Sequence, residues 1–142
     1  MQITASHDFK ANRAKVLARF RDPDRIEEVL GALADQLDRT AEAPSPAWRG
    51  SVKWRGSPRP LTMTLRETTP NAALTLDIKA DIGDATVVFR FADLPGGGCR
   101  VTAGATPLPR GVVARVAVAS MGLVRTKLSK RLARLVAALG KA

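Results

Sequence analysis

Few side chains of this 142-residue chain could act as catalytic groups, because it has one histidine, His7, and one cysteine, Cys99. His7 alternates in step with Ile3 and Phe9, which predicts the apolar side of a strand. There it is either a histidine at the rim of a cavity or a polar contact inside it, with general base as one role. Cys99 starts a later strand, and we interpret it as a small semi-buried residue, since a nucleophilic thiol needs a nearby base.

Two other groups could suggest chemistry, and we interpret both as surface features. Asp77, Asp81 and Asp84 lie near one predicted hairpin, on the polar side of strands or in a turn. Paired carboxylates that catalyse hydrolysis need a sheltered cleft, so we expect these three to be solvated. The glycines at 96–98 lack the Gly-Lys-Ser/Thr ending of a phosphate loop and precede a strand, which predicts a hairpin loop. We therefore expect no metal site and no cofactor.

Charge is distributed very unevenly along the chain. Its formal net charge is +10, yet no acidic residue follows Asp93. On a helix, Lys127, Lys130 and Arg134 fall within about 60° of arc, and Arg131 lies at the edge of the apolar stripe. These four residues are either a solvated face or a site for an anionic partner, such as lipid headgroups or nucleic-acid phosphates. An aromatic content of 4% argues against sequence-specific DNA binding.

The elements that position these residues follow from the periodicity of apolar side chains. Residues 2–9 alternate and predict a strand. Asn12 is the expected N-cap of a helix over 13–20, and Asp22 that of a second helix reaching about residue 34, with Pro23 at its first position. From 37 to 106 the period is two, with turn residues between short runs, which predicts six strands in an antiparallel meander.

The last part of the chain predicts one long helix. Pro107 and Pro109 are expected to end the final strand. Residues 110–139 then contain one weak helix former, Gly122, and Gly140 is the expected terminator. The predicted architecture is α+β: a seven-stranded antiparallel sheet wrapped around a long C-terminal helix, with two short helices between the first two strands, in a single domain over 1–142. The gap between the twisted sheet and the helix is the expected ligand site.

This order of elements resembles the START-like, or SRPBCC, superfamily over essentially the whole chain. The motifs that carry the resemblance are Asp22-Pro23-Asp24 between the short helices, Trp48-Arg49-Gly50 opening the third strand, and residues 97–102 in the last strand. The resemblance implies a helix-grip fold with a cavity under the helix for lipids, sterols, polyketides or other apolar molecules. A minority of that superfamily are enzymes. It has no universal catalytic motif, so it implies a pocket and no reaction.

We expect the protein to bind a small apolar or amphipathic molecule, lipid-like or polyketide-like, between sheet and helix. Trp48 and Trp54 share one side of a strand, where both belong to the core or one lines the pocket. The flexible, small and flat side chains expected in the wall are Trp54, Met63, Leu65, Leu76, Ile78, Phe89, Phe91, Val113, Ala117, Met121 and Val124, with His7 as a polar contact.

Two other functions stay open. The first is an interaction module whose basic helix docks on RNA, an acidic protein or a membrane surface. The second is a cyclase-like or hydrolase-like enzyme, which requires polar groups converging around His7 and ranks last. Neither a secretory signal nor an apolar stretch of about 18 residues is visible, so we expect no transmembrane segment and a cytoplasmic protein.

Overall fold

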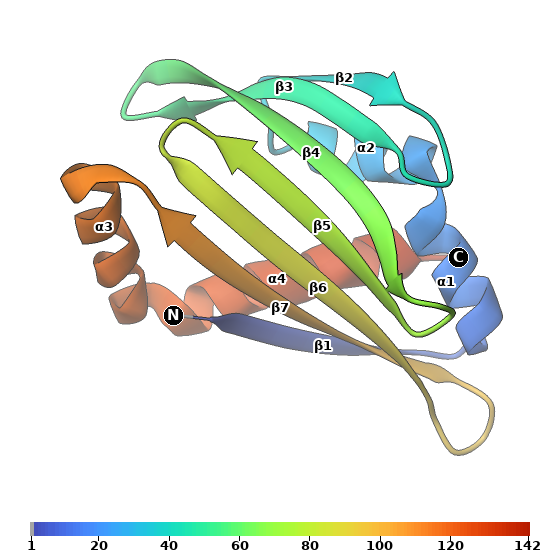
Figure 1. Ribbon diagram of the computed structural model, residues 1–142. Helices are drawn as coiled ribbons and strands as arrows, with labels where there is room; N and C mark the ends of the chain where they lie inside the picture. The colour runs from blue at the N-terminus through green and yellow to red at the C-terminus, as the bar shows by residue number, and fades with distance from the viewer. Residues whose placement is uncertain (1) are drawn as a thin grey trace.

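A computed structural model describes residues 2–142 of the chain. Figure 1 shows one curved sheet with helices on one side of it. In chain order the elements are β1 (Ile3–Phe9), α1 (Arg13–Arg21), α2 (Pro23–Gly31), β2 (Gln36–Ala41), β3 (Ala47–Trp54), β4 (Ser57–Thr69), β5 (Ala73–Ala80), β6 (Gly83–Asp93), β7 (Cys99–Pro109), α3 (Gly111–Ser120), the 3-10 turn η1 (Met121–Val124) and α4 (Arg125–Gly140).

The sheet confirms the predicted α+β helix-grip architecture. Its strand order is β1-β7-β6-β5-β4-β3-β2, and every neighbouring pair is antiparallel. Helix α4 crosses behind the sheet, with α1 and α2 near its C-terminal end and α3 at the opposite side (Figure 1). The two predicted N-caps are confirmed: Asn12 Oδ1 accepts from the Lys15 amide at 3.0 Å, and Asp22 Oδ1 accepts from the Asp24 amide at 3.0 Å.

Within residues 2–142, four prolines belong to strands, including Pro107 and Pro109, which were expected to end the last strand. Pro58 and Pro60 belong to β4, and Pro107 and Pro109 belong to β7. Their strands have one neighbour at these positions, because β5 joins β4 only from Leu61 and β1 joins β7 only up to residue 105. A missing N–H is tolerated where one side of a strand is unpaired, so Pro58, Pro60 and Pro107 do not interrupt their strands, and β7 ends only at Pro109.

The predicted single helix over 110–139 is wrong, because the segment is divided into α3, η1 and α4. The division surrounds Gly122, the weak helix former, and follows Ser120, whose Oγ donates to the Val116 carbonyl at 2.9 Å. Such back-bonding often bends helices. The 16-residue α4 remains the long helix that covers the sheet. Because the helix is broken, the apolar stripe of α3 does not continue in phase into α4.

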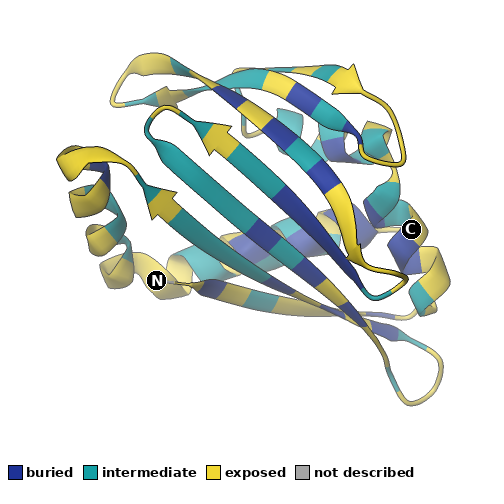
Figure 2. Cartoon of the chain, viewed as in Figure 1, coloured by how far each residue is buried: buried dark blue, intermediate teal, exposed yellow. Residues whose placement is uncertain are grey.

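The core lies between the inner face of the sheet and the helices (Figure 2). Val16, Leu17 and Phe20 of α1 and Val136 of α4 are almost completely buried there. Gly140, the expected terminator, is instead the last residue of α4 and is buried against β1. A Cβ atom on it would lie 2.3 Å from Cζ of Phe9, so this glycine permits the close approach of helix and strand.

Glu27 joins α2 to the sheet. Its Oε1 accepts from Nε1 of the buried Trp48 at 3.0 Å and from Nε of Arg39. The Arg39 hydrogen bond holds the pKa of Glu27 below its usual 4.5, against the opposing effect of burial. A carboxyl whose pKa is lowered by folding stabilises the fold fully above its unfolded pKa, and this contribution is lost as the pH falls through the folded pKa.

We therefore expect the Glu27→Gln substitution to weaken the dependence of stability on pH below about 4.5. The free energy of unfolding, measured with urea at pH values on both sides of 4.5, should fall less steeply on acidification than in the wild type. Glu28→Gln is the matched control, because Glu28 is a neighbour on the same helix with the same charge. Equal pH slopes for the two variants would contradict the role assigned to Glu27.

Candidate ligand-binding cavity

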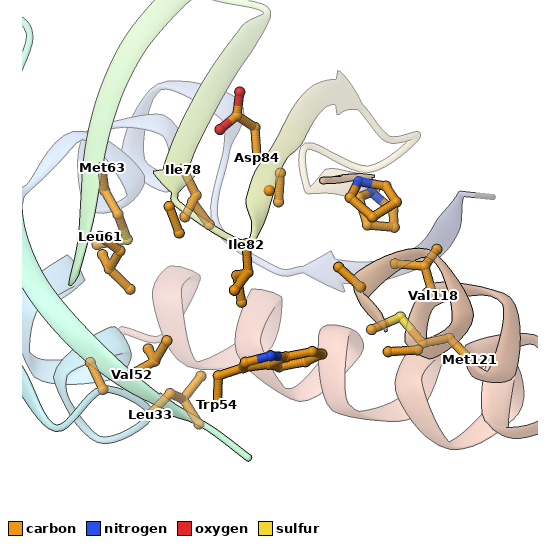
Figure 3. A pocket seen from close by; sticks show the side chains of 18 of the residues that line it. Leu33, Val52, Trp54, Leu61, Met63, Ile78, Ile82, Asp84, Val118 and Met121 are labelled. Atoms are coloured by element: carbon orange, nitrogen blue, oxygen red, sulfur yellow. The ribbon is translucent and has the colours of Figure 1, made fainter. Parts of the chain in front are cut away.

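A cavity of about 350 Å³ lies between the sheet and the helices α2 and α3. Figure 3 shows Trp54 along one wall, Leu61 and Met63 opposite α3, and Met121 reaching in from the end of α3. The cavity is lined on one side by Ala114 and Ala117 of α3, which follows the end of β7 at an angle to α4 (Figure 1). Its other large apolar side chains are Leu30, Leu33, Leu37, Val52, Ile78, Ile82 and Val118.

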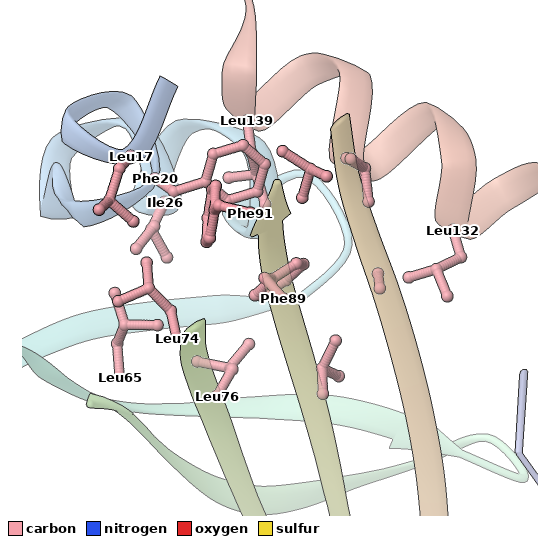
Figure 4. Close-up of a cluster of buried hydrophobic side chains, with 14 of the residues drawn as sticks. Leu17, Phe20, Ile26, Leu65, Leu74, Leu76, Phe89, Phe91, Leu132 and Leu139 are labelled. Carbon is pink, nitrogen blue, oxygen red and sulfur yellow. The ribbon is translucent and has the colours of Figure 1, made fainter. Parts of the chain in front are cut away.

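A second cavity of about 210 Å³ lies deeper, beneath α4. Phe20, Leu76, Phe89 and Leu139 line it, and Figure 4 shows these side chains converging from α1, β5, β6 and α4. The two cavities share four lining residues and are therefore neighbours separated by side chains. The shared residues are Leu30, Leu33, Met63 and Ile78.

Eight of the twelve predicted ligand-binding residues line these cavities. Trp54, Ala117 and Met121 line the first cavity, and Leu65, Leu76 and Phe89 line the second. Met63 and Ile78 line both. The two tryptophans differ: Trp48 is 1% exposed and belongs to the core, whereas Trp54, near the end of the same strand, faces the open space.

The other four predicted residues line neither cavity. Phe91 is packed in the core, with its ring 5.0 Å from that of Phe20. Val113 and Val124 are exposed, because the break at η1 changes which side of the helix meets the sheet. His7 is exposed too, and its ring lies edge-on to that of Phe9 at 4.6 Å between centroids.

Sequence reasoning missed part of the wall. Leu30 lies near the end of α2 and Leu33 in the turn after it, and their apolar spacing by itself indicates core packing. Pro107 and Pro109 line the first cavity because they continue β7 beyond the expected strand end. The apolar periodicity is visible in both cases, but it does not distinguish a side chain that fills the core from one that faces a void.

One charged side chain lies at the wall of the cavities. Among the residues that the structure describes, Asp84 is the one ionisable side chain that lines either cavity. Its carboxylate points away from the centre of the space (Figure 3), where Oδ2 accepts from Nη2 of Arg110 at 2.9 Å and Oδ1 is buried without a hydrogen-bond partner among residues 2–142. Asp77 and Asp81 also form ion pairs, with Arg66 and Arg59. The interior therefore offers apolar contact and little else.

The remaining candidate groups lie outside the cavities. Cys99 is buried, and desolvation raises the pKa of its thiol above 9.0, which disfavours the nucleophilic thiolate. Within residues 2–142, no cluster of three or more His, Cys, Asp or Glu residues could hold a metal ion. In the same residues no helix is both long and apolar enough to cross a membrane. The four predicted anion-binding residues all lie on α4, outside both cavities: Lys127, Lys130, Arg131 and Arg134.

Comparison with known proteins finds likeness in structure alone, since no family model and no curated protein matches the sequence. Protein TTHA0849 from Thermus thermophilus has a TM-score of 0.74 at 15% identity, over 99% of this chain and 95% of that one. The Zhui aromatase/cyclase from Streptomyces sp. R1128 has a TM-score of 0.70 at 13% identity, over 99% and 92%. Truncated norcoclaurine synthase from Thalictrum flavum has 0.72 at 10% identity, over 99% and 91%.

The chain has the fold of these proteins. At identities of 10–15% the likeness concerns the fold alone and carries no residue roles. It extends over nearly the full length of each chain and agrees with the helix-grip fold expected from the sequence.

Proposed function

We propose that this protein binds a small apolar molecule in the two neighbouring cavities. The observation that carries the proposal is the composition of the walls, which are aliphatic and aromatic from the rim at Trp54 to the inner end at Phe20 and Leu139. Binding by burial of apolar surface contributes about 25 cal/mol per Å² before the entropic costs of association. Met63 and Met121 supply flexible walls that adjust to the shape of the ligand.

Within apolar molecules, the structural neighbours favour one class. The Zhui protein and the di-domain protein StfQ, which matches at a TM-score of 0.65, are aromatase/cyclases by name. Ligands of the polyketide type, with fused rings and few charges, suit a space walled by Trp54, Phe20 and Phe89. Lipid-like chains are the second class that the same walls accommodate.

Binding is proposed here in preference to a cyclase-like reaction. Acid–base catalysis needs a titratable group within hydrogen-bond reach of the reacting atoms. His7, the candidate base, shares the side of β1 that carries Phe9, but it is exposed and lines neither cavity. Among the described residues, Asp84 lines the first cavity alone, without a second titratable group, and its Oδ2 is engaged by Arg110.

The test is saturable binding of a neutral apolar fluorophore, Nile red, together with native mass spectrometry for a co-purified molecule. Ala117→Trp places a large ring in the first cavity, and we expect it to weaken Nile red binding about tenfold or more. Ala119→Trp is the matched control, because Ala119 is an exposed residue of the same helix. Absence of saturable binding, or equal affinity in both variants, would overturn the proposal.

A further inference from the structure

Helix α3 is apolar on both of its faces. Ala117 and Val118 face the first cavity, whereas Val112 and Val116, one turn apart, are 75% and 61% exposed. A helix that is hydrophobic all round is normally buried on all sides. The outer face of α3 is therefore a surface without a partner among residues 2–142.

The exposed apolar surface continues into η1. Leu123 is 90% exposed, and Val124 follows it. Of the seven large apolar side chains that are exposed within residues 2–142, five lie between 112 and 124. We call residues 111–124 the α3–η1 tip. Large apolar side chains concentrated in one exposed segment mark a site of interaction with a protein or a membrane.

Cations surround this tip. Arg115 projects from α3, and Arg125 follows η1 directly. Lys127 and Lys130 line the same shallow depression as Leu123 and Val124. Within residues 2–142 no carboxylate forms an ion pair with these four basic side chains. The tip thus combines exposed aliphatic side chains with free positive charge over a short distance.

Among the possible partners, an anionic lipid bilayer satisfies both features. Its acyl boundary accepts aliphatic side chains, and its headgroups attract Lys and Arg. A symmetric contact with a second copy would bring the same cations of two molecules together. RNA would use the cations and leave Val116 and Leu123 exposed to water, since its bases stack on aromatic side chains.

We propose that the α3–η1 tip docks on anionic lipid bilayers, with Val112, Val116 and Leu123 entering the headgroup boundary and Lys127 and Lys130 on the headgroups. The same helix forms one wall of the first cavity, through Ala117 and Val118. Docking therefore brings that wall to the bilayer, where an apolar ligand dissolves. This last step rests on the proposed ligand binding, whereas the docking itself does not.

The experiment is co-sedimentation of the full chain with vesicles of phosphatidylcholine alone and of phosphatidylcholine mixed equally with phosphatidylglycerol. We expect binding to the mixed vesicles, weakened by salt, and at least about tenfold weaker binding to the neutral ones. Equal binding to both compositions would overturn the proposal. So would dimerisation through the tip without vesicles, or displacement from the mixed vesicles by RNA at equal phosphate concentration.

Paired variants separate the two features of the tip. Val116→Ser with Leu123→Ser, and Lys127→Gln with Lys130→Gln, should each reduce binding to mixed vesicles about tenfold. The matched controls are Leu108→Ser, an exposed aliphatic residue elsewhere, and Arg49→Gln with Lys79→Gln, exposed cations on other strands. Equal losses in variants and controls would overturn the proposal. The tip variants should bind Nile red as the wild type does. A loss of vesicle binding is then distinguished from a failure of the proposed ligand binding.

Discussion

Replacing Phe20 with alanine is expected to lower the free energy of unfolding by about 3–5 kcal/mol. Phe20 is 2% exposed and joins α1 to the sheet. The centroid of its ring lies 5.3 Å from the ring centroid of Phe89, 5.0 Å from that of Phe91 and 6.3 Å from that of Phe9. Truncation therefore removes three aromatic contacts in addition to the apolar area of the ring.

The position of Phe20 beside the second cavity places this loss at the upper end of that range. The cost of a large-to-small substitution increases with the volume that stays empty afterwards. Here the space left by the ring joins an existing cavity of about 210 Å³, which the surrounding sheet and α4 keep open. Neighbouring side chains therefore cannot close over it.

Urea denaturation monitored by circular dichroism measures the change. Leu123→Ala is the control, because Leu123 is 90% exposed and its truncation should change the free energy of unfolding by less than about 0.5 kcal/mol. A loss below about 1 kcal/mol for Phe20→Ala would show that α1 is not held through this aromatic cluster.

The sheet was predictable because its signals are local. Alternation of apolar side chains specifies strands, and short turns specify antiparallel neighbours, so the strand order followed from the chain order. The N-caps at Asn12 and Asp22 were predictable for the same reason, since a cap depends on a few adjacent residues. The pairing of β1 with β7 has no such local signal, because it joins the first and the last strand of the chain.

The helix break and the strand prolines were not predictable because they depend on distant neighbours. Gly122 weakens a helix by about 1 kcal/mol. Tertiary packing readily outweighs this amount, so that it can keep the helix continuous or break it. Pro60 and Pro107 are acceptable in strands only because β5 and β1 end before reaching them. Sequence patterns specify the elements, but they do not specify where one strand extends beyond the end of the strand beside it.

The walls of the cavity were predictable in type and less so in detail. Strand parity correctly placed Met63 and Ile78 on the inner face, because side chains alternate strictly between the two faces of a strand. In the broken C-terminal helix, the predicted spacing of inward-facing residues does not hold across the break. Ala114 and Val118 therefore face inward, where a continuous helix would have turned Val113 and Val124 toward the sheet.

The relation between the two cavities leads to the second large effect. Met63 and Ile78 stand between them, and a ligand that extends from one into the other must pass these side chains. For a series of linear alcohols from octanol to hexadecanol, affinity should rise about fourfold with each added methylene while new groups are buried, at about 0.8 kcal/mol each. The rise should stop when the available space is full.

Ile78→Trp fills the junction with a ring and should end this rise at a shorter chain. Because several methylenes then stay unburied, we expect hexadecanol to bind at least about a hundredfold more weakly than to the wild type, with octanol changed about threefold or less. Displacement of Nile red measures both alcohols. Lys79→Gln, on the outer side of the same strand, is the control. Parallel losses for both alcohols in Ile78→Trp would mean that the cavities act as one undivided space, and a series with no chain-length dependence would mean that the alcohols bind outside them.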